Sequence, residues 1–262
     1  SLAKCYEHIL LARMLPILKS TKSIHRNQFG FQKGCATHDA IYTVDSITRR
    51  RANKGKTTWA AFIDTAKAYP SCMKAALFSR LADTKCTGRL WLAVHAIHYN
   101  TTASILTPYG PTPSYAMENG LKEGATLSPI LYLLYVDTLL TSMEEKNLGL
   151  RIAGQWCGII AYADDLCLLA ASPKALQDQL DHLSTWNFHW RMRTNHSKTA
   201  VVPFGPDAIP APHAPFTIRG LPPLKVESEY TYLGVTLQSN LSASSHTTTK
   251  IGSLHSGRAK TQ

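Results

Sequence analysis

The sequence predicts an α+β fold with an antiparallel sheet, on three observations. Helix-like segments and short strand-like runs follow one another in an irregular order, without the strict alternation of a parallel α/β fold. Two apolar runs within residues 158–171 are separated only by a tight turn, which predicts a β-hairpin. A hydrophobic fraction of 44% over 262 residues is ordinary for a globular protein and sufficient for a buried core.

Composition and charge limit the kind of partner. Lys and Arg number 28 against 17 Asp and Glu, which gives a net charge of +11 and a pI of about 9.4. Such an excess favours a polyanion, nucleic acid above all, although a merely basic protein accounts for the charge about as well. The six cysteines are scattered without a Cys-x-x-Cys pair, which argues against a zinc site or a disulfide framework and fits a reducing compartment.

Nothing in the sequence indicates a membrane protein or an exported one. No apolar run reaches the ~18 residues that a spanning helix needs. The start of the chain lacks the basic-then-apolar pattern of a signal peptide. Because the chain begins with Ser1 instead of Met, we expect it to be a piece of a longer protein.

In the N-terminal part we expect two helices joined by a loop. Apolar residues at near-helical spacing predict a helix over residues 1–19, which Pro16 kinks or ends. Residues 25–34 carry Phe-Gly-Phe among basic and amide side chains, so this loop either lies along a nucleic acid or is pinned by two buried rings. The second helix covers residues 37–51, and its final Arg49-Arg50-Arg51 either complements the helix dipole or contacts phosphates.

The middle of the chain begins with a buried strand over residues 57–63 that ends at Asp64. Amphipathic helices follow over residues 71–82 and 87–99. Weak alternation with several Pro and Gly residues at 101–118 predicts a twisted hairpin. An acidic residue directly after a buried strand is well placed for chemistry, although a turn or helix-entry Asp is the commoner explanation.

The C-terminal half begins with a loop that contains Gly120 and Gly124 and leads into a long apolar helix over residues 128–145, with a Ser-Pro start. Beyond the central hairpin we expect a helix, a strand, a connecting loop and a pair of strands, over residues 172–193, 200–204, 205–223 and 230–237. After residue 238 the chain is polar and is either poorly ordered or the start of a missing domain.

The central hairpin carries the adjacent carboxylates Asp164 and Asp165 in its turn, between two runs too short for helices. Like charges held this close cost energy unless a cation neutralises them, which points to a divalent-metal site. A solvated Asp-Asp turn is the commoner explanation for such a pair. If the strand before Asp64 lies beside the hairpin, three carboxylates meet at one sheet edge, as in two-Mg²⁺ phosphoryl-transfer sites. The sequence contains no P-loop, Gly-x-Ser-x-Gly or His-Glu-x-x-His motif.

Seven segments, taken in order, resemble the reverse transcriptases, in particular those of LINE-type (non-LTR) retrotransposons. The resemblance covers most of the chain, and each segment alone is a weak to moderate signal. The similar segments are the N-terminal residues 1–15, Gln28 to Ile41, Ala61 to Tyr69 (motif A), Asn119 to Pro129 (motif B), Tyr162-Ala163-Asp164-Asp165 (motif C), Asn195 to Thr199 (motif D) and Tyr232-Leu233-Gly234-Val235 (motif E).

The resemblance implies an RNA-directed DNA polymerase that uses two Mg²⁺ ions, or Mn²⁺ in their place. It implies that Asp64 and Asp164 bind both ions, that Asp165 is a supporting carboxylate, and that the backbone carbonyl of Thr65 completes one coordination shell. All three carboxylates are then catalytic. The implied partners are an RNA template, a DNA primer and deoxynucleoside triphosphates, with no membrane.

Nucleotide contacts are implied for a second group of residues. The ring of Tyr69 would lie under the incoming sugar and exclude a 2′-hydroxyl. Lys198 would approach the triphosphate and protonate the leaving pyrophosphate. Motif B, with Glu123 and Gly124, would position the nucleotide, and Glu123 stands where the family usually has Gln.

Contacts with the primer and template are implied for a third group. Ala163 is small enough to leave room for the primer end beside the carboxylates, and Tyr162 precedes it. The strand turn Tyr232-Leu233-Gly234 would hold the primer. Lys33 is a candidate for a template phosphate.

The implied architecture is a right-hand polymerase, in which a palm with an antiparallel sheet flanked by helices carries helical fingers and a truncated thumb. The expected parts are partial fingers at 1–57, a palm at 58–204 with a fingers insertion around 85–118, the palm end and primer-grip strands at 205–240, and the start of a truncated thumb at 241–262. The family's fingers Arg is expected upstream of Ser1, and flanking domains of a larger polyprotein are missing. The resemblance also implies an intracellular protein, nuclear in a eukaryotic host.

Several alternatives stay open on the sequence alone. An inactive or domesticated copy would keep the fold and bind RNA without synthesis. A group II intron or retron-type reverse transcriptase would share the palm. Viral RNA polymerases also share it, but they usually carry Gly-Asp-Asp at the hairpin, and Tyr69 argues against them. A basic binding module without catalysis would leave the Asp164-Asp165 turn unexplained.

Overall fold

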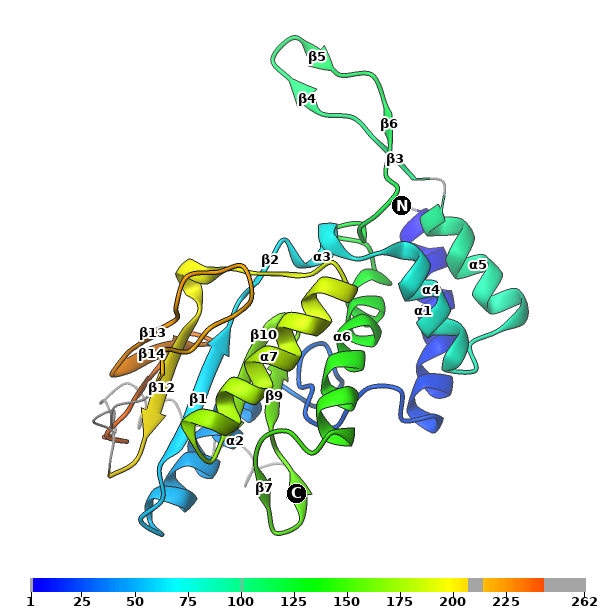
Figure 1. Ribbon diagram of the computed structural model, residues 1–262. Helices are drawn as coiled ribbons and strands as arrows, with labels where there is room; N and C mark the ends of the chain where they lie inside the picture. Colours follow the sequence, from blue (N-terminus) through cyan, green and yellow to red (C-terminus); the bar gives the residue numbers. More distant parts are fainter. Residues whose placement is uncertain (1, 100, 207–213, 243–262) are drawn as a thin grey trace. The chain divides into compact units, whose positions relative to one another are not determined.

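The computed structural model describes residues 2–99, 101–206 and 214–242 (Figure 1). These residues fall into two compact units, each assembled from separate stretches of sequence. Of the described residues, the first unit contains 2–25, 66–99, 101–138 and 187–193, and the second contains 26–65, 139–186, 194–206 and 214–242. Among the described residues, no helix is long and apolar enough to cross a membrane.

The first unit is mainly helical. Its helices are α1 (Leu2–Ser20), α3 (Ala68–Ser71), α4 (Lys74–Asp83), α5 (Gly88–Tyr99) and most of α6 (Ser128–Glu145). Between α5 and α6 the chain forms two short antiparallel pairs, β3 (Thr102–Ala103) with β6 (Tyr115–Ala116) and β4 (Leu106–Thr107) with β5 (Gly110–Pro111). The twisted hairpin expected at residues 101–118 is therefore present (Figure 1).

The second unit is built on a five-stranded sheet. Its strand order is β13 (Lys225–Val226), β12 (Ala200–Phe204), β1 (Thr58–Ile63), β10 (Asp165–Ala170) and β9 (Ile159–Tyr162). All neighbours are antiparallel except β12 and β13, which are parallel. The mixed α+β class expected from the sequence is confirmed. The remaining short strands are β2 (Thr65–Ala66), β7 (Arg151–Ile152), β8 (Gln155–Trp156), β11 (Arg193–Thr194), β14 (Glu229–Tyr232) and β15 (Val235–Gln238).

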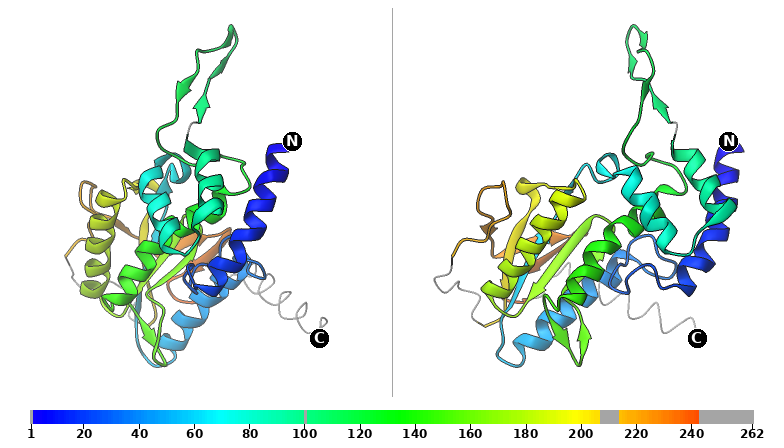
Figure 2. Two further views of the ribbon diagram at one scale, coloured as in Figure 1. Left: turned by 90° about the vertical axis from the view of Figure 1, so that its right-hand side faces the viewer. Right: turned by 45° about the vertical axis from the view of Figure 1, so that its right-hand side comes forward.

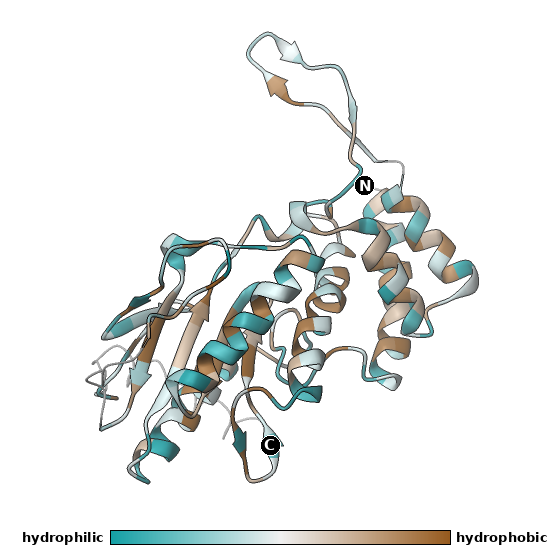
Figure 3. Cartoon of the chain, viewed as in Figure 1, coloured by the Kyte–Doolittle hydropathy of each residue, from teal (hydrophilic) through white to brown (hydrophobic). Residues whose placement is uncertain are grey.

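Both faces of this sheet are covered. Every residue of β1 is buried, as expected for a central strand that is apolar on both sides. Helix α2 (Thr37–Ala52) and the β14–β15 hairpin form one core with the face that carries Phe62 and Cys167. Helix α7 (Pro173–His189) lies across the other face (Figures 1 and 2) and buries Leu176, Leu180 and Leu183. The strands have mainly hydrophobic colours, whereas the outer side of α7 is largely hydrophilic (Figure 3).

Most expected elements are present, and the differences have local causes. The helix expected over 71–82 begins only at Lys74, as α4, because Cys72 and Met73 are extended, with φ −60° and ψ 124° at Cys72; the separate helix α3 ends at Ser71. The helix expected over 172–193 ends at His189, and Arg191 follows with a φ of 52° that no right-handed helix contains. Pro16 lies within α1, which continues to Ser20. The expected thumb start lies almost entirely outside the described residues.

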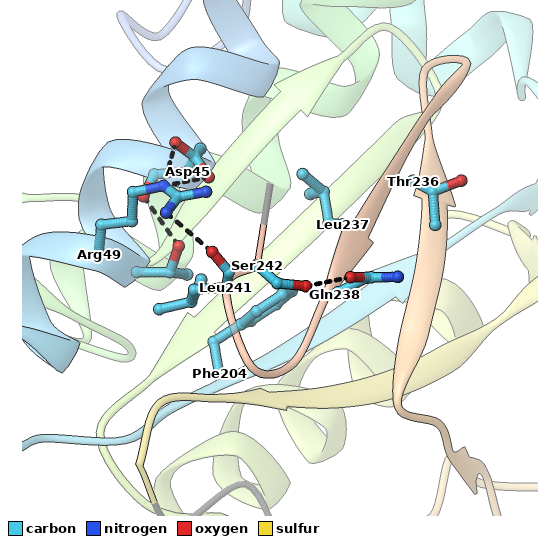
Figure 4. A pocket seen from close by; sticks show the side chains of 9 residues that line it. Asp45, Arg49, Phe204, Thr236, Leu237, Gln238, Leu241 and Ser242 are labelled. Atoms are coloured by element: carbon cyan, nitrogen blue, oxygen red, sulfur yellow. Dashed lines mark hydrogen bonds and ion pairs between the residues drawn. The ribbon is translucent and has the colours of Figure 1, made fainter. Parts of the chain in front are cut away.

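The basic end of α2 is partly engaged inside the second unit. The Arg49 guanidinium lies 2.8 Å from the Asp45 carboxylate and donates a hydrogen bond of 2.9 Å to the carbonyl oxygen of Leu241 (Figure 4). The Arg51 guanidinium donates to the carbonyl oxygen of Thr57 at 2.9 Å. Arg50 is exposed. Within the cluster Arg49–Arg51, the prediction of a phosphate contact is therefore best kept for Arg50.

Candidate functional site

The Asp-Asp pair lies at the tip of the β9–β10 hairpin. Tyr162 pairs with Asp165 across the two strands, so Ala163 and Asp164 alone form the turn. Asp165 is therefore the first residue of β10. The expectation from the sequence that it belongs to the turn was wrong. Ala163 is 5% exposed and has a φ of 56°, a left-handed conformation that is strained for a residue with a Cβ. A two-residue turn of this kind fixes both carboxylates close to the strand ends.

Asp64 lies at the same edge of the sheet. Strand β1 runs antiparallel to β10, their last pair is Ile63 with Leu166, and Asp64 follows directly. The hydroxyl of Thr65 donates a hydrogen bond of 3.2 Å to the carbonyl oxygen of Asp164. The structure thus brings Asp64 and Thr65 together with Asp164 and Asp165, although Thr65 and Asp164 are 99 positions apart in the sequence.

Burial and mutual repulsion set the electrostatics of these carboxylates. Burial, together with the negative charges of Asp164 and Asp64, raises the pKa of Asp165 to about 6. Burial also raises the pKa of Asp164, with a smaller contribution from the charge of Asp64. The Lys198 ammonium acts in the opposite direction and lowers the pKa of both. Three carboxylates therefore share one partly buried edge of the sheet, and the positive charge of Lys198 acts on Asp164 and Asp165 there.

The donor set fits a hard divalent cation. Asp64, Asp164 and Asp165 offer carboxylate oxygens, and Thr65 offers a backbone carbonyl, which are the ligand types that Mg²⁺ prefers. In the described part of the chain, no three Asp, Glu, His or Cys side chains are already grouped closely enough to form a metal-binding cluster. Burial is the main cause of the raised pKa values of Asp164 and Asp165, and repulsion between the carboxylates adds to it; a bound cation would favour the ionised forms.

Lys198 is presented by the 3₁₀ helix η1 (His196–Lys198), which follows Asn195. The N–H of Asn195 donates a hydrogen bond of 2.8 Å to the carbonyl oxygen of Asp64, so this segment is anchored beside the carboxylates. The Lys198 side chain is exposed, while its carbonyl oxygen accepts a hydrogen bond of 2.6 Å from the hydroxyl of Tyr230. An exposed ammonium on an anchored backbone can reach an anionic ligand at this edge.

The residues expected to hold the primer belong to the β14–β15 hairpin. Leu233 and Gly234 form its two-residue turn, with φ values of 50° and 81° that match a type I′ turn. Tyr232 is only 3% exposed, and its ring packs against Phe62 at a centroid distance of 5.3 Å. The structure therefore makes the Tyr232 side chain a core residue and leaves the turn as the part that a primer can contact. Lys33 and Tyr162 are exposed and half-buried, respectively.

Tyr69, Glu123 and Gly124 lie in the first unit. Tyr69 is in α3, and its ring contacts that of Tyr132 at 5.3 Å with an interplanar angle of 65°. Glu123 and Gly124 are exposed in the loop before α6, and Gly124 has a φ of 74°. This loop is held at its far end by the buried carboxylate of Glu7, which accepts the N–H of Thr126 at 2.6 Å. Such a carboxylate satisfies donors that the helix start leaves unpaired.

Gln28 is a buried residue of the site that sequence reasoning missed. Its side-chain amide contacts the backbone of Ala163, 135 positions away. The loop at residues 25–34 had been expected to contact nucleic acid or to be pinned by its aromatic rings. The available signal was an amide residue two positions before Gly30 in a loop rich in polar residues. An amide at this position does not by itself predict a contact with Ala163.

Replacing Asp165 with Asn should raise the stability of the metal-free protein at neutral pH. The folded-state pKa of about 6 exceeds the usual value of about 3.9, so stability falls as the pH rises from about 4 to about 6 and stays lower above that. An Asn cannot ionise and avoids this loss. We expect the melting temperature in EDTA at pH 7 to rise by about 2–4 °C, the shift that about 1 kcal/mol gives in a protein of this size. Near pH 4 the difference should vanish; an equal difference at both pH values would contradict the electrostatic cause.

Comparison with known families gives a match along most of the chain. Residues 1–237 match the family described as reverse transcriptase (RNA-dependent DNA polymerase). The RNA-directed DNA polymerase from the mobile element jockey of Drosophila melanogaster is 26% identical over 259 residues, 95% of this chain. The probable RNA-directed DNA polymerase from transposon BS of the same species is 25% identical over 260 residues, 94% of this chain. The chain spans 27% of the length of each of these two relatives.

Solved structures show a related fold. Telomerase from Candida tropicalis, in complex with a TWJ fragment of telomeric RNA, superimposes with a TM-score of 0.62 and 14% identity, over 93% of this chain and 37% of that one. Apo telomerase from the same species gives a TM-score of 0.60 with 13% identity, over 92% of this chain and 40% of that one. At such low identity the likeness concerns the fold alone.

Proposed function

Because this chain belongs to the reverse transcriptase family, we propose that it is the RNA-directed DNA polymerase domain of a non-LTR retrotransposon. It transfers deoxynucleoside monophosphates to a primer 3′-hydroxyl under the direction of an RNA template. The observation that carries the proposal is the meeting of Asp64 with the Asp164-Asp165 hairpin at one edge of the sheet. The two Drosophila melanogaster relatives described above, which each match more than nine-tenths of the chain, are RNA-directed DNA polymerases of mobile elements.

Asp64 and Asp164 would hold two Mg²⁺ ions, with Asp165 as a supporting carboxylate and the Thr65 carbonyl as a further ligand. When bound, the ions lower the charge repulsion at this edge and make the primer hydroxyl a better nucleophile. The protein itself needs no side-chain nucleophile, because phosphoryl transfer depends mainly on positioning and charge neutralisation. Mn²⁺ has the same ligand preferences and can replace Mg²⁺.

The remaining residues position the substrate and handle one proton. In the reaction the primer 3′-hydroxyl loses its proton to water, its oxygen forms a bond to the α-phosphorus, and the bond from that phosphorus to the oxygen bridging to the β-phosphate breaks. The exposed ammonium of Lys198 neutralises the triphosphate and gives a proton to the leaving pyrophosphate. Glu123 and Gly124 contact the nucleotide from the loop before α6. Leu233 and Gly234 contact the primer, with Tyr162 and Ala163 beside its end.

Within a right-hand polymerase, the five-stranded sheet with α7 is the palm, α2 belongs to the partial fingers, and the β14–β15 turn is the primer grip. Lys33 contacts the template. The chain works as part of a larger polyprotein, in keeping with the share of its relatives that it spans. In a eukaryotic host it acts in the nucleus.

The test is primer extension on an RNA template by the full-length element protein, with Mg²⁺ and deoxynucleotides. We expect extension that stops when EDTA is added. RNA binding without any extension would contradict the proposal and favour the alternative, an inactive copy that has kept only the fold and the RNA-binding surface.

Replacing Tyr69 with Val should let ribonucleotides enter the growing strand. In the proposed complex the ring of Tyr69 occupies the space that a 2′-hydroxyl needs, and Val is too small to fill it. We expect the ratio of kcat/KM for deoxynucleotides over ribonucleotides to fall at least tenfold, or about 1.4 kcal/mol of discrimination. Tyr69→Phe keeps the ring and is the matched control. An unchanged ratio in Tyr69→Val would remove Tyr69 from the sugar-selecting role.

A further inference from the structure

A short segment before α2 lies along the free edge of β9. The N–H of Phe29 donates to the carbonyl oxygen of Ala161 at 2.8 Å, and the N–H of Ala161 donates to the carbonyl oxygen of Asn27 at 2.9 Å. These bonds form an isolated parallel bridge between Gln28 and Ala161. Since β9 is the last strand of the sheet, this segment closes an otherwise open edge two residues before the catalytic turn.

The Gln28 side chain grips the turn itself. It is buried, with 3% exposure. Its Oε1 accepts the N–H of Ala163 at 2.8 Å and that of Gly30 at 2.9 Å, and its Nε2 donates to the carbonyl oxygen of Ala163 at 3.3 Å. One amide therefore satisfies both backbone polar groups of Ala163. Among side chains, only Asn and Gln carry a neutral donor and acceptor in this fork, and Asn is one methylene shorter.

Gly30 allows this close contact. A Cβ added to Gly30 would lie 2.4 Å from the backbone nitrogen of Ala163, well inside van der Waals contact. The segment is further fixed by Gln32, whose side-chain amide donates to the carbonyl oxygen of Gln28. The spacing of Gln28 and Gly30 is thus explained by contacts with one turn residue, without any contact to nucleic acid.

We propose that Gln28 is a positioning residue for the carboxylates. Ala163 has a strained φ of 56° and is bonded directly to Asp164, so whatever holds Ala163 also sets the direction of the Asp164 side chain. The uncharged amide does this without adding a negative charge beside Asp164 and Asp165. The expected effect on kcat rests on the proposed polymerase function, whereas the expected effect on the conformation of Ala163 does not.

The test compares Gln28→Met with Gln179→Met in the full-length protein. Met is close to Gln in volume and removes the hydrogen bonds of the side chain. Gln179 is a matched control because it is also fully buried, at 0% exposure, and its Nε2 donates at 2.9 Å to the carbonyl oxygen of Gly158, just before the opposite end of β9. Gln28→Met loses two buried hydrogen bonds to the turn residue Ala163, whereas Gln179→Met loses one to Gly158, the residue before β9.

We expect Gln28→Met to lower kcat for primer extension at least tenfold, with KM for the nucleotide and Kd for the primer–template changed less than twofold. A loss of this size is what a small misplacement of a catalytic group causes. Amide hydrogen exchange of the peptide that contains Ala163 should become at least tenfold faster. Gln179→Met should lower the melting temperature to a similar extent, keep kcat within twofold and leave exchange at Ala163 unchanged.

The proposal is overturned if both variants lose stability alike while kcat and exchange at Ala163 stay at wild-type values in Gln28→Met. If the wild-type protein has no polymerase activity, the proposed function fails, and hydrogen exchange alone decides on Gln28. If Gln28→Met does not fold, Gln28→Glu is measured in its place. It keeps the two accepted hydrogen bonds, loses the donated one, and should still lower kcat and speed exchange at Ala163; wild-type values of both would overturn the proposal.

Discussion

Replacing Asp164 with Ala is expected to abolish primer extension while leaving primer–template binding intact. Asp164 is one of two carboxylates proposed to hold both ions, and each ion contributes several kcal/mol of charge stabilisation in phosphoryl transfer. We expect kcat to fall at least a thousandfold, about 4 kcal/mol. Binding should change little, because nucleic-acid affinity comes mainly from basic side chains and the phosphate backbone. Single-nucleotide incorporation measures the first quantity, and a filter-binding titration at fixed salt measures the second.

Asp178→Ala is the control for this change. Asp178 lies on α7, is 44% exposed, and pairs at 2.9 Å with Lys174 on the same helix. It has no role in the proposed site, so its loss should leave kcat within twofold. Circular dichroism at 25 °C should show that both variants are folded. Extension by Asp164→Ala at more than a tenth of the wild-type rate would remove Asp164 from the metal site.

Local signals in the sequence predicted most elements. The helix expected over residues 128–145 is α6 (Ser128–Glu145), because a Ser-Pro start and a long apolar face are both properties of the segment itself. The β9–β10 hairpin followed from two apolar runs around a turn. Sequence patterns place the end of each strand, and an antiparallel sheet then brings those ends together, which is why Asp64 could be expected beside Asp165.

Contacts between distant segments were not predictable in the same way. The amide of Gln28 contacts Ala163, which is 135 positions away, and no periodicity in the sequence predicts that pairing. Tyr232 was expected to contact the primer, but its ring packs on Phe62 in the core. Alternation of apolar and polar residues along a strand predicts that one face is buried, but it does not predict which neighbouring element covers that face. The two-residue strands β7, β8 and β13 were likewise too short to produce a pattern.

Replacing Arg80 with Met is expected to cause a large loss of stability although Arg80 lies outside the site. Asp137 is 4% exposed on α6, and its carboxylate accepts the N–H of His25 at 2.6 Å and an Arg80 N–H at 2.9 Å. Removing the guanidinium takes the charge of Arg80 away from this buried carboxylate, and breaking a buried ion pair in this way costs about 3–5 kcal/mol. The melting temperature at pH 7 should therefore fall by about 10 °C or more.

The pH dependence distinguishes this cause from lost packing. Burial already raises the pKa of Asp137 against the opposing effect of Arg80, and removing Arg80 should raise it further. An acid with a raised folded-state pKa binds more protons folded than unfolded, so stability increases as the pH falls from that pKa toward the unfolded value of about 3.9. The deficit of Arg80→Met should accordingly shrink between pH 7 and about pH 4. A deficit that is constant with pH would mean that the arginine acts through packing.

The surface pair Arg26–Glu144 provides the matched control for Arg80. Its nitrogen–oxygen distance is 2.6 Å, shorter than the 2.9 Å of Arg80–Asp137, but its side chains are 54% and 27% exposed against 23% and 4%. If distance governed the contribution, Arg26→Met would be the more damaging change. Because water solvates a charge whose partner is removed at the surface, we expect Arg26→Met to cost at most about 1 kcal/mol. Burial, and not the length of the ion pair, then determines which arginine the fold depends on.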